Sequence, residues 1–270
     1  MLKRTITGAF ITAAVYLMIY FSHIPSVILC ATAILCAFSV YEIYRATDTI
    51  GNEVFFTLSM LSAVGIAFWS IPYYKEVLGV TFILSVLVFV WMMIRKKHCR
   101  LSSPIKAAFI VAMIVVLFKA MPELRGLDNG LYYLTAAISA CFIGDIAAYL
   151  VGRSIGKHKL APKVSPNKTI EGSVAGIVFT VLVMLLCGIL LEYFKIAQVD
   201  YIRLTIYSLL VSLVGQFGDL AMSAVKRACN IKDFGNLFPG HGGILDRFDS
   251  HLFAIAFTYL FCIYTGGFLI

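Results

Sequence analysis

Two aspartates lie inside long apolar runs of the sequence, where a carboxylate is costly. Asp145 lies in the run 130–152 and Asp219 in the run 203–225, and each directly follows a glycine. A carboxylate at the centre of a membrane-spanning helix costs about 2.5–3.5 kcal/mol on insertion scales, so it usually faces a cavity, a partner or an ion. Both lie about seven residues from the same end of their spans, roughly 10 Å at 1.5 Å per residue. We therefore expect them to face one pocket, the alternative for each being a structural hydrogen bond to a neighbouring helix.

Asp219 begins a line of polar side chains on one helix face. Ser223 and Lys226 follow at i+4 and i+7, a spacing that keeps all three on the same side of the helix. Arg227 comes next in the chain. The spacing predicts a helix that carries a carboxylate deep in the membrane, a hydroxyl above it and cations at the rim.

A glycine-rich loop precedes the last apolar run. Its glycines, Gly240, Gly242 and Gly243, permit turns with positive φ that expose successive backbone N–H groups to an anion. Asp246 and Asp249 follow at i and i+3, on one face at the start of a helix, where the helix dipole favours acids.

These residue types together indicate phosphate chemistry with a metal. Carboxylate oxygens suit Mg²⁺, which commonly binds one or two carboxylates plus substrate phosphates, and cationic side chains suit the phosphate oxygens. The combination favours phosphoryl or nucleotidyl transfer, with one metal ion or two left open. The candidate metal ligands are Asp145, Asp219, Asp246 and Asp249, and the candidate catalytic residues are Asp219, Lys226, Arg227, His241, Asp246 and Arg247.

A second polar stretch, residues 165–172, lies directly before the apolar run 172–194. It could form the other rim of the pocket or be only a Pro-terminated turn with a helix cap. The nearby stretch 152–157 is not a P-loop, because three residues separate its glycines where that motif has four. The candidate substrate-binding residues are Ser165, Lys168, Thr169, Glu171, Ser223, Lys232, Gly240, Gly242 and Gly243.

The composition requires a bilayer around these residues. Apolar types make up 61% of the 270 residues and charged types 13%, whereas soluble domains have about 45–50% and about 25%. A chain of this size cannot bury so much apolar surface in its own interior. This excludes a soluble enzyme, a disordered chain and a disulfide-stapled secreted module, and the seven cysteines contain no CxxC pair.

The hydropathy pattern predicts an all-α polytopic membrane protein with about nine transmembrane helices. A spanning helix needs roughly 20 apolar residues. The short runs leave eight or ten crossings open, and a signal peptide at the N-terminus is disfavoured because no clean cleavage site closes the first run. The nine runs are 5–22, 25–44, 54–73, 77–94, 106–122, 130–152, 172–194, 203–225 and 248–268.

The positive charges predict the orientation. With nine spans and a cytoplasmic N-terminus, only Lys75, Lys119, Arg125, Lys195 and Arg203 of the 22 Lys and Arg residues fall outside. The positive-inside rule therefore predicts a C-terminus outside and a polar site facing the cytoplasm. The net charge of +8 is explained by this asymmetry and by contact with anionic membrane lipids, and we expect no nucleic-acid partner.

The C-terminal half resembles the CDP-diacylglycerol synthase (phosphatidate cytidylyltransferase) family. Its signature extends without a visible departure from Ser223-Ala-Val-Lys226-Arg227 through Pro239-Gly240-His241-Gly242-Gly243 to Asp246-Arg247-Phe248-Asp249. Gly218-Asp219, the stretch 165–172 and Asp145 with Ala148-Tyr149 resemble further blocks, although Asn167 stands where the family usually has a basic residue. The first 120 residues match only in hydropathy. We accordingly divide the chain into N-terminal transmembrane helices (1–122) and C-terminal catalytic helices with cytoplasmic loops (123–270).

The resemblance implies a reaction of CTP with phosphatidic acid, dependent on Mg²⁺, that gives CDP-diacylglycerol and pyrophosphate for phospholipid synthesis. It also implies a bacterial cytoplasmic (inner) membrane location and a homodimer. The alternatives are an ion-coupled transporter, which also needs buried acids, and another CTP-using membrane enzyme, either a lipid-alcohol kinase or a synthase for a different lipid phosphate. A structural scaffold would leave the polar cluster unexplained.

Overall fold

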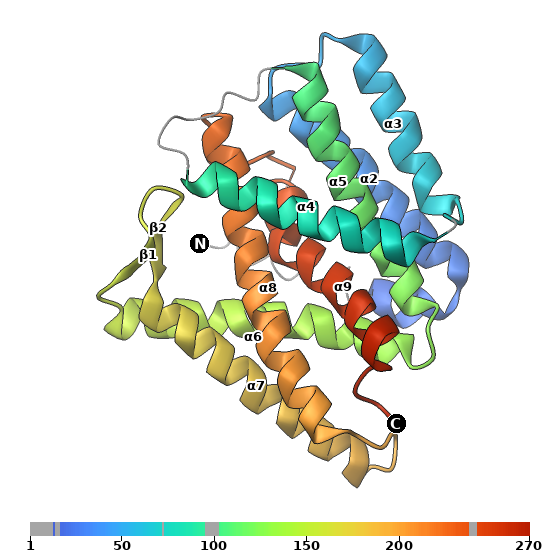
Figure 1. Ribbon diagram of the computed structural model, residues 1–270, viewed down its shortest axis with the longest axis vertical. Coiled ribbons are helices and arrows are strands. Elements are labelled where there is room, and N and C mark those ends of the chain that lie inside the picture. The colour runs from blue at the N-terminus through green and yellow to red at the C-terminus, as the bar shows by residue number, and fades with distance from the viewer. Residues whose placement is uncertain (1–12, 14–16, 72, 95–102, 238–241) are drawn as a thin grey trace.

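Figure 1 shows the computed structural model, which describes residues 13, 17–71, 73–94, 103–237 and 242–270. A short 3-10 turn, η1 (Phe21–His23), precedes the helices. A small hairpin of β1 (Lys159–Ala161) and β2 (Ser165–Thr169) joins two of them. The helices are α2 (Pro25–Ala46), α3 (Glu53–Phe68), α4 (Tyr74–Ile94), α5 (Pro104–Arg125), α6 (Gly130–Ile155), α7 (Ile170–Tyr193), α8 (Tyr201–Ala228) and α9 (Leu245–Thr265).

Seven of the described helices, α2 and α4–α9, are long and apolar enough to cross a membrane. Each matches a predicted run, so the predicted all-α polytopic class is confirmed. The run 54–73 forms only the 16 residues of α3, about 24 Å at 1.5 Å per residue, which is less than a hydrocarbon core of about 30 Å. The run 5–22 lies largely outside the described residues, and the total of nine spans stays a prediction.

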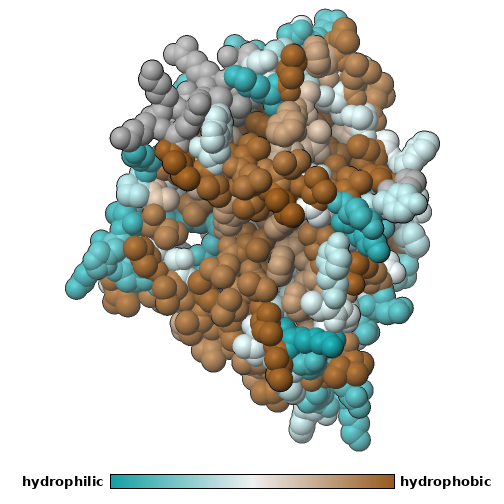
Figure 2. Space-filling model, in the orientation of Figure 1, coloured by the Kyte–Doolittle hydropathy of each residue, from teal (hydrophilic) through white to brown (hydrophobic). Residues whose placement is uncertain are grey.

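The outer surface of the bundle is apolar. Three large side chains of α7, Phe179, Leu182 and Leu186, are exposed by 48%, 56% and 54%. Figure 2 shows hydrophobic side chains spread across the middle of the molecule. A continuous apolar surface of this extent is unfavourable in water and favourable against lipid chains. The chain is therefore a multi-pass membrane protein.

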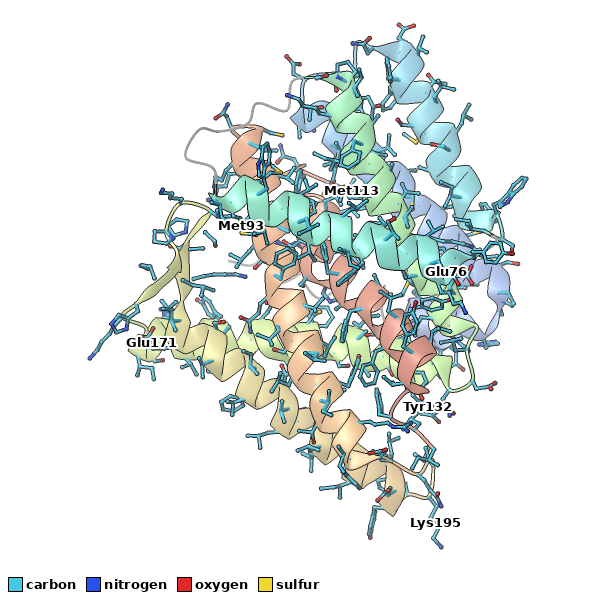
Figure 3. The ribbon with its side chains drawn as sticks, viewed as in Figure 1. Glu76, Met93, Met113, Tyr132, Glu171 and Lys195 are labelled. Carbon is cyan, nitrogen blue, oxygen red and sulfur yellow. The ribbon has the colours of Figure 1, made fainter. Side chains whose placement is uncertain are left out.

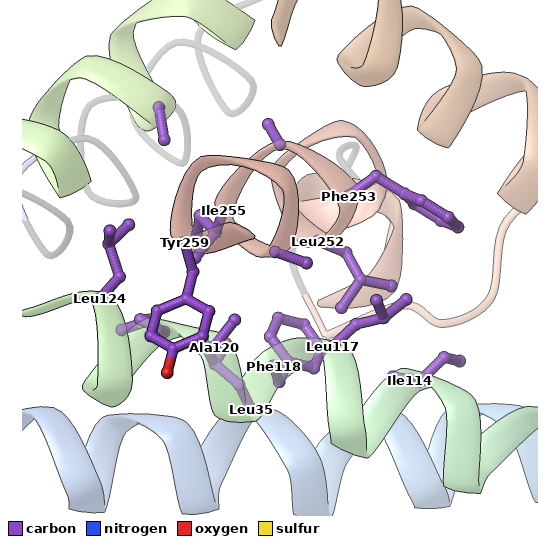
Figure 4. Packing of buried hydrophobic residues seen from close by; sticks show 14 of the residues in the cluster. Leu35, Ile114, Leu117, Phe118, Ala120, Leu124, Leu252, Phe253, Ile255 and Tyr259 are labelled. Carbon is purple, nitrogen blue, oxygen red and sulfur yellow. The ribbon is translucent and has the colours of Figure 1, made fainter. Parts of the chain in front are cut away.

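Buried side chains of α5 and α9 pack against each other in the interior. Leu117 and Phe118 of α5 lie beside Leu252 of α9, and Leu35 of α2 and Phe253 of α9 belong to the same buried cluster (Figure 4). These side chains are at most 8% exposed. The core is therefore continuous across the predicted division at residues 122 and 123, which itself stays a prediction.

Two glycines bring the helices of the C-terminal half close together. A Cβ atom on Gly172 of α7 would lie 2.6 Å from the carbonyl oxygen of Ala148 in α6. A Cβ atom on Gly218 of α8 would lie 2.8 Å from the carbonyl oxygen of Asp249 in α9. Small residues of this kind allow helix backbones in membranes to approach each other. The second contact places Asp219, the next residue of α8, beside the first turns of α9.

The hairpin between α6 and α7 is an addition that the sequence analysis did not predict. Its strands pair antiparallel, with Lys159 opposite Thr169 and Ala161 opposite Ser165. At three and five residues they are too short to give a period of two in the hydropathy pattern. Thr169 then caps α7, because its Oγ1 accepts a hydrogen bond from the N–H of Gly172 at 3.2 Å. The helix cap, one of the two alternatives for the stretch 165–172, is present, and the hairpin lies beyond it at one end of α6 and α7 (Figure 1).

The two ends of α7 differ in their surroundings. Figure 3 labels Glu171 at the hairpin and Lys195 just past the opposite end of the helix. The hairpin end carries the hydrophilic side chains visible at the left of Figure 2. Three polar residues singled out in the sequence, Asp145, Lys168 and Asp219, lie near this end, in α6, β2 and α8.

Candidate active site

An open cavity of about 520 Å³ lies where α6, α7 and α8 meet the hairpin. Pockets for small ligands usually have volumes of about 300–1,000 Å³. Asp145 of α6, Lys168 of β2 and Asp219 of α8 all line this cavity. The two aspartates found inside apolar runs therefore share one pocket.

Asp219 forms an ion pair at the wall of this cavity. Its carboxylate is paired with the ammonium group of Lys168, and the two side chains are 24% and 25% exposed. The hydroxyl of Ser223 donates to Asp219 Oδ1 at 3.4 Å, as the i+4 spacing predicted. Asp219 thus holds a cation at a position that solvent reaches.

The wall of the cavity on α6 carries a stripe of polar residues at four-residue spacing. Asp145, Tyr149 and Arg153 all line the cavity, and Arg153 Nη1 donates to the Tyr149 hydroxyl at 3.1 Å. Lys159 of the hairpin adds a second cation. Neither Arg153 nor Lys159 was predicted as a site residue. For Arg153 a signal was present, because positions i, i+4 and i+8 from Asp145 indicate one helix face.

A neutral pair forms the wall between α7 and α8. The Ser173 hydroxyl donates to Gln216 Oε1, and Gln216 Nε2 donates to the Ser173 carbonyl oxygen at 3.1 Å. Both residues line the cavity and both were missed. The signal for Gln216 was its position three residues before Asp219, on the same face of α8.

A second lysine–aspartate pair lies buried beside α9. Lys226 Nζ donates to Asp246 Oδ1 at 2.9 Å and lies 4.0 Å from Asp249 Oδ2. The side chains of Lys226 and Asp246 are only 11% and 2% exposed. Asp249 is in turn an electrostatic neighbour of Asp219, so the open pair and the buried pair are parts of one charged cluster.

The other carboxylate oxygen of Asp246 binds the loop before α9. Asp246 Oδ2 accepts hydrogen bonds from the N–H of Phe234 at 2.8 Å and of Gly243 at 2.9 Å. Gly242 has φ +82°, and a Cβ atom there would lie 2.6 Å from Asp246 Oδ2. The predicted positive-φ turn is confirmed at Gly242. The N–H of Gly243, however, binds Asp246 where the sequence analysis expected it to face an external anion.

Two predicted site residues hold the hairpin in place. Arg227 donates from Nε to the carbonyl oxygen of Val164 at 3.2 Å and from Nη1 to that of Ile231 at 3.1 Å. Glu171 pairs with the His158 ring at 2.6 Å. These contacts fix the hairpin against α7 and α8, and neither residue is among those that line the cavity.

The remaining predicted residues lie at different distances from the cavity. Thr169 lines it, whereas Ser165 lies in β2 opposite Ala161. Lys232 and Arg247 are exposed and are not among the lining residues. Gly240 and His241 lie outside the described residues.

The donor set at the cavity fits a magnesium ion. No group of three His, Cys, Asp or Glu side chains that could hold a metal occurs within the described ranges, but Mg²⁺ commonly needs only one or two carboxylates plus substrate phosphates. Asp219 already holds the Lys168 ammonium group, and the carboxylates of Asp145 and Asp249 are its electrostatic neighbours. A cation could replace Lys168 at Asp219. The same cation could bind Asp246 only if Lys226 left Asp246 Oδ1.

Comparisons with known proteins identify the family of the chain. The model of the cytidylyltransferase family matches residues 2–265, and the chain belongs to that family. A phosphatidate cytidylyltransferase of Bacillus subtilis (strain 168) is 46% identical over 138 residues, 51% of this chain and 50% of the relative. A phosphatidate cytidylyltransferase of Staphylococcus saprophyticus is 40% identical over 145 residues, 54% of each chain.

A longer match comes from Staphylococcus aureus (strain COL). Its phosphatidate cytidylyltransferase is 34% identical over 206 residues, 73% of this chain and 75% of the relative. The chain thus spans about half the length of the Bacillus and Staphylococcus saprophyticus relatives it matches and three quarters of this one.

Proposed function

We propose that this protein is a phosphatidate cytidylyltransferase, which transfers CMP from CTP to phosphatidic acid and releases CDP-diacylglycerol and pyrophosphate. One observation carries the proposal: Asp145 and Asp219 share a single cavity with the cations of Arg153, Lys159 and Lys168, at one end of a membrane-embedded bundle. Family membership and the names of the bacterial relatives support the choice of CTP and phosphatidic acid.

The proposed chemistry needs no strong general base. An oxygen of the phosphatidate phosphate, which is already anionic, attacks the α-phosphorus of CTP while the bond from that phosphorus to the bridging oxygen of the β-phosphate breaks. Pyrophosphate takes the bonding electrons and leaves. Because no proton has to be abstracted, catalysis rests on positioning and on neutralisation of phosphate charge.

The residues of the cavity can supply that neutralisation. Arg153 and Lys159 present cations at the rim, and Lys168 can exchange its contact with Asp219 for one with a phosphate oxygen. Lys226, which is not among the lining residues, binds Asp246 and lies 4.0 Å from Asp249, and so neutralises part of the charge of these carboxylates. The Ser173–Gln216 pair fixes the position of α7 against α8 at the level of these charges.

We propose Mg²⁺ as the cofactor, held by Asp219 with Asp249 and Asp145 beside it. When bound, the ion would neutralise charge on the triphosphate. A second cation at Asp246 would first have to displace Lys226 from Oδ1. The support is a cluster of carboxylates that outnumber the cations beside them. Asp145, Asp219, Asp246 and Asp249 lie near the ammonium groups of Lys168 and Lys226, and the Arg247 guanidinium also acts on Asp145.

The proposed setting is the cytoplasmic membrane of a bacterium, with the cavity open to the cytoplasm. The basic side chains Arg153, Lys157, Lys159 and Lys163 at the cavity end support this orientation, because positive loops stay inside. A cytoplasmic cavity would receive CTP from solution and phosphatidic acid from the inner leaflet. A homodimer is proposed from the family resemblance alone.

Product analysis tests the proposal directly. The full-length protein in detergent is given CTP labelled in the α-phosphate, phosphatidic acid and Mg²⁺, and labelled lipid and pyrophosphate are measured together. We expect one pyrophosphate for each CDP-diacylglycerol, and no lipid labelling with diacylglycerol as the acceptor. Release of CDP would identify a CTP-dependent kinase, and absence of any CTP turnover with phosphatidic acid would reject the transferase.

A further inference from the structure

One carboxylate of the N-terminal helices reaches the start of α9, far from it in sequence. Glu42 of α2 is 2% exposed. Its Oε1 accepts a hydrogen bond from the N–H of Ile244 at 2.8 Å, and its Oε2 accepts one from the N–H of Leu245 at 2.9 Å. Ile244 and Leu245 lie more than 200 positions after Glu42 in the chain.

These two bonds supply the cap that α9 lacks in its own sequence. Ile244 is the N-cap residue of α9, and its apolar side chain makes no capping hydrogen bond. The first N–H groups of a helix have no partner within the helix and need one from elsewhere. A carboxylate is also favourable at a helix N-terminus because of the helix dipole. Glu42 meets both requirements from another helix.

The loop beside α9 is shaped around this carboxylate. A Cβ atom on Gly243 would lie 2.1 Å from Glu42 Oε1, and one on Gly235 would lie 2.8 Å from the same atom. Neither position has room for a side chain while Glu42 stays in place. The glycines of the loop therefore serve the approach to Glu42 as well as the turn itself.

Glu42 and Asp246 together bind three consecutive backbone N–H groups. Asp246 accepts a hydrogen bond from the N–H of Gly243, and Glu42 accepts hydrogen bonds from the N–H groups of Ile244 and Leu245. Asp246 is itself the second residue of α9 and is bound by Lys226. A rotation or a slide of α9 would thus break the bonds to Glu42 and the bond to Lys226 together.

We propose that Glu42 is a positioning residue, which holds the first turn of α9 so that Asp246 and Asp249 keep their register with Lys226. The effect on turnover rests on the proposed function. Glu42 is not among the residues that line the cavity, so it acts through α9. Its loss should change turnover more than substrate binding.

The test compares Glu42→Gln with wild type and with the matched control Glu53→Gln, an exposed acid in the first turn of α3. Glutamine keeps the size of the side chain but loses the charge and one of the two acceptors. We expect a kcat at least tenfold lower with a KM for CTP within threefold of wild type. We also expect amide hydrogen exchange at least tenfold faster at Ile244 and Leu245, with the other helices unchanged. Glu53→Gln should match wild type in all three measurements.

A second variant approaches the same contact from the loop. Gly235→Ala leaves the charge of Glu42 intact but places a Cβ atom only 2.8 Å from Oε1. It should lower kcat three- to tenfold with the same local increase in exchange. Unchanged exchange at Ile244 and Leu245 in Glu42→Gln would overturn the proposal. Faster exchange throughout the bundle would also overturn it, as would a fall in activity that is fully explained by a loss of folded protein. If Glu42→Gln shows faster exchange at Ile244 and Leu245 but the wild-type protein makes no CDP-diacylglycerol, the role of Glu42 at α9 stands. The transferase function is then rejected instead.

Discussion

The two lysine–aspartate pairs of this protein use the same chemistry in opposite surroundings. The Lys168–Asp219 pair joins the hairpin to α8, and about a quarter of each side chain is exposed at the cavity. The Lys226–Asp246 pair joins α8 to α9, and Asp246 is 2% exposed with both oxygens occupied. The open pair can exchange partners when a substrate or metal arrives, whereas the buried pair holds the loop and helix that surround it.

The difference follows from what each carboxylate would lose when its lysine leaves. Solvent and ligands can replace Lys168 at Asp219, because about a quarter of each side chain is exposed at the cavity. Removal of one partner from a buried pair leaves an uncompensated charge and costs about 3–5 kcal/mol. The comparison assigns ligand exchange to Asp219 and structural support to Asp246.

Asp219→Asn should have the largest effect on activity. The substitution keeps the shape of the side chain but removes the charge that holds a cation at the cavity, and loss of one such electrostatic group costs about 10²–10³-fold in kcat. The measurement is CDP-diacylglycerol formation from labelled CTP, with thermal unfolding in detergent as the check on folding. A variant that keeps most of its activity would remove Asp219 from the site.

Asp246→Asn should instead lower stability. The charge of Lys226 would lose its main partner, and we expect a loss of about 3 kcal/mol, the lower end of the range for buried pairs, because Asp249 is 4.0 Å from Lys226. The unfolding temperature in detergent measures this loss. If Asp246→Asn unfolds no earlier than Asp219→Asn, the contrast between the two pairs is wrong.

Lys168→Ala should lower activity about tenfold, since one charge-assisted contact to phosphate contributes about 1.5 kcal/mol. The effect should be mainly on KM for CTP or for phosphatidic acid. Lys163→Ala is the matched control, because Lys163 is exposed on the same hairpin and is not among the residues that line the cavity. Equal kinetics of the two variants would argue against a role of Lys168 in binding phosphate.

Ser223→Ala should have the smallest effect. The hydroxyl of Ser223 donates to Asp219 Oδ1 at 3.4 Å, a long hydrogen bond. We expect kcat to fall less than threefold, with unchanged unfolding temperature. A tenfold loss would show that Ser223 contacts substrate, which would extend the site one turn along α8.

The sequence predicted the site correctly where the residues concerned lie on one helix or in one turn. The i+4 and i+7 spacing predicted that Ser223 and Lys226 share a face with Asp219, and the glycine pattern predicted a positive φ at Gly242. The apolar runs predicted the spanning helices because burial in lipid dominates their composition.

Contacts between distant segments could not be predicted in this way. Glu42 lies in an apolar run, as Asp145 and Asp219 do, but its position near the end of that run gave no reason to single it out, and its partners at Ile244 and Leu245 depend on packing across the bundle. The hairpin that carries Lys168 to Asp219 was missed because its strands are too short for a periodic signal. Both are tertiary features that no local pattern specifies.

The binding of a divalent cation at Asp219 can be measured without turnover. Mn²⁺ is titrated into the detergent-solubilised protein with CTP present and followed by electron paramagnetic resonance, with a titration of CTP alone to subtract the ion that the nucleotide binds in solution. We expect Asp219→Asn to weaken binding to the protein at least tenfold, while Lys163→Ala binds as wild type does. Wild-type Mn²⁺ affinity in a folded Asp219→Asn variant would show that Asp219 does not hold the cation.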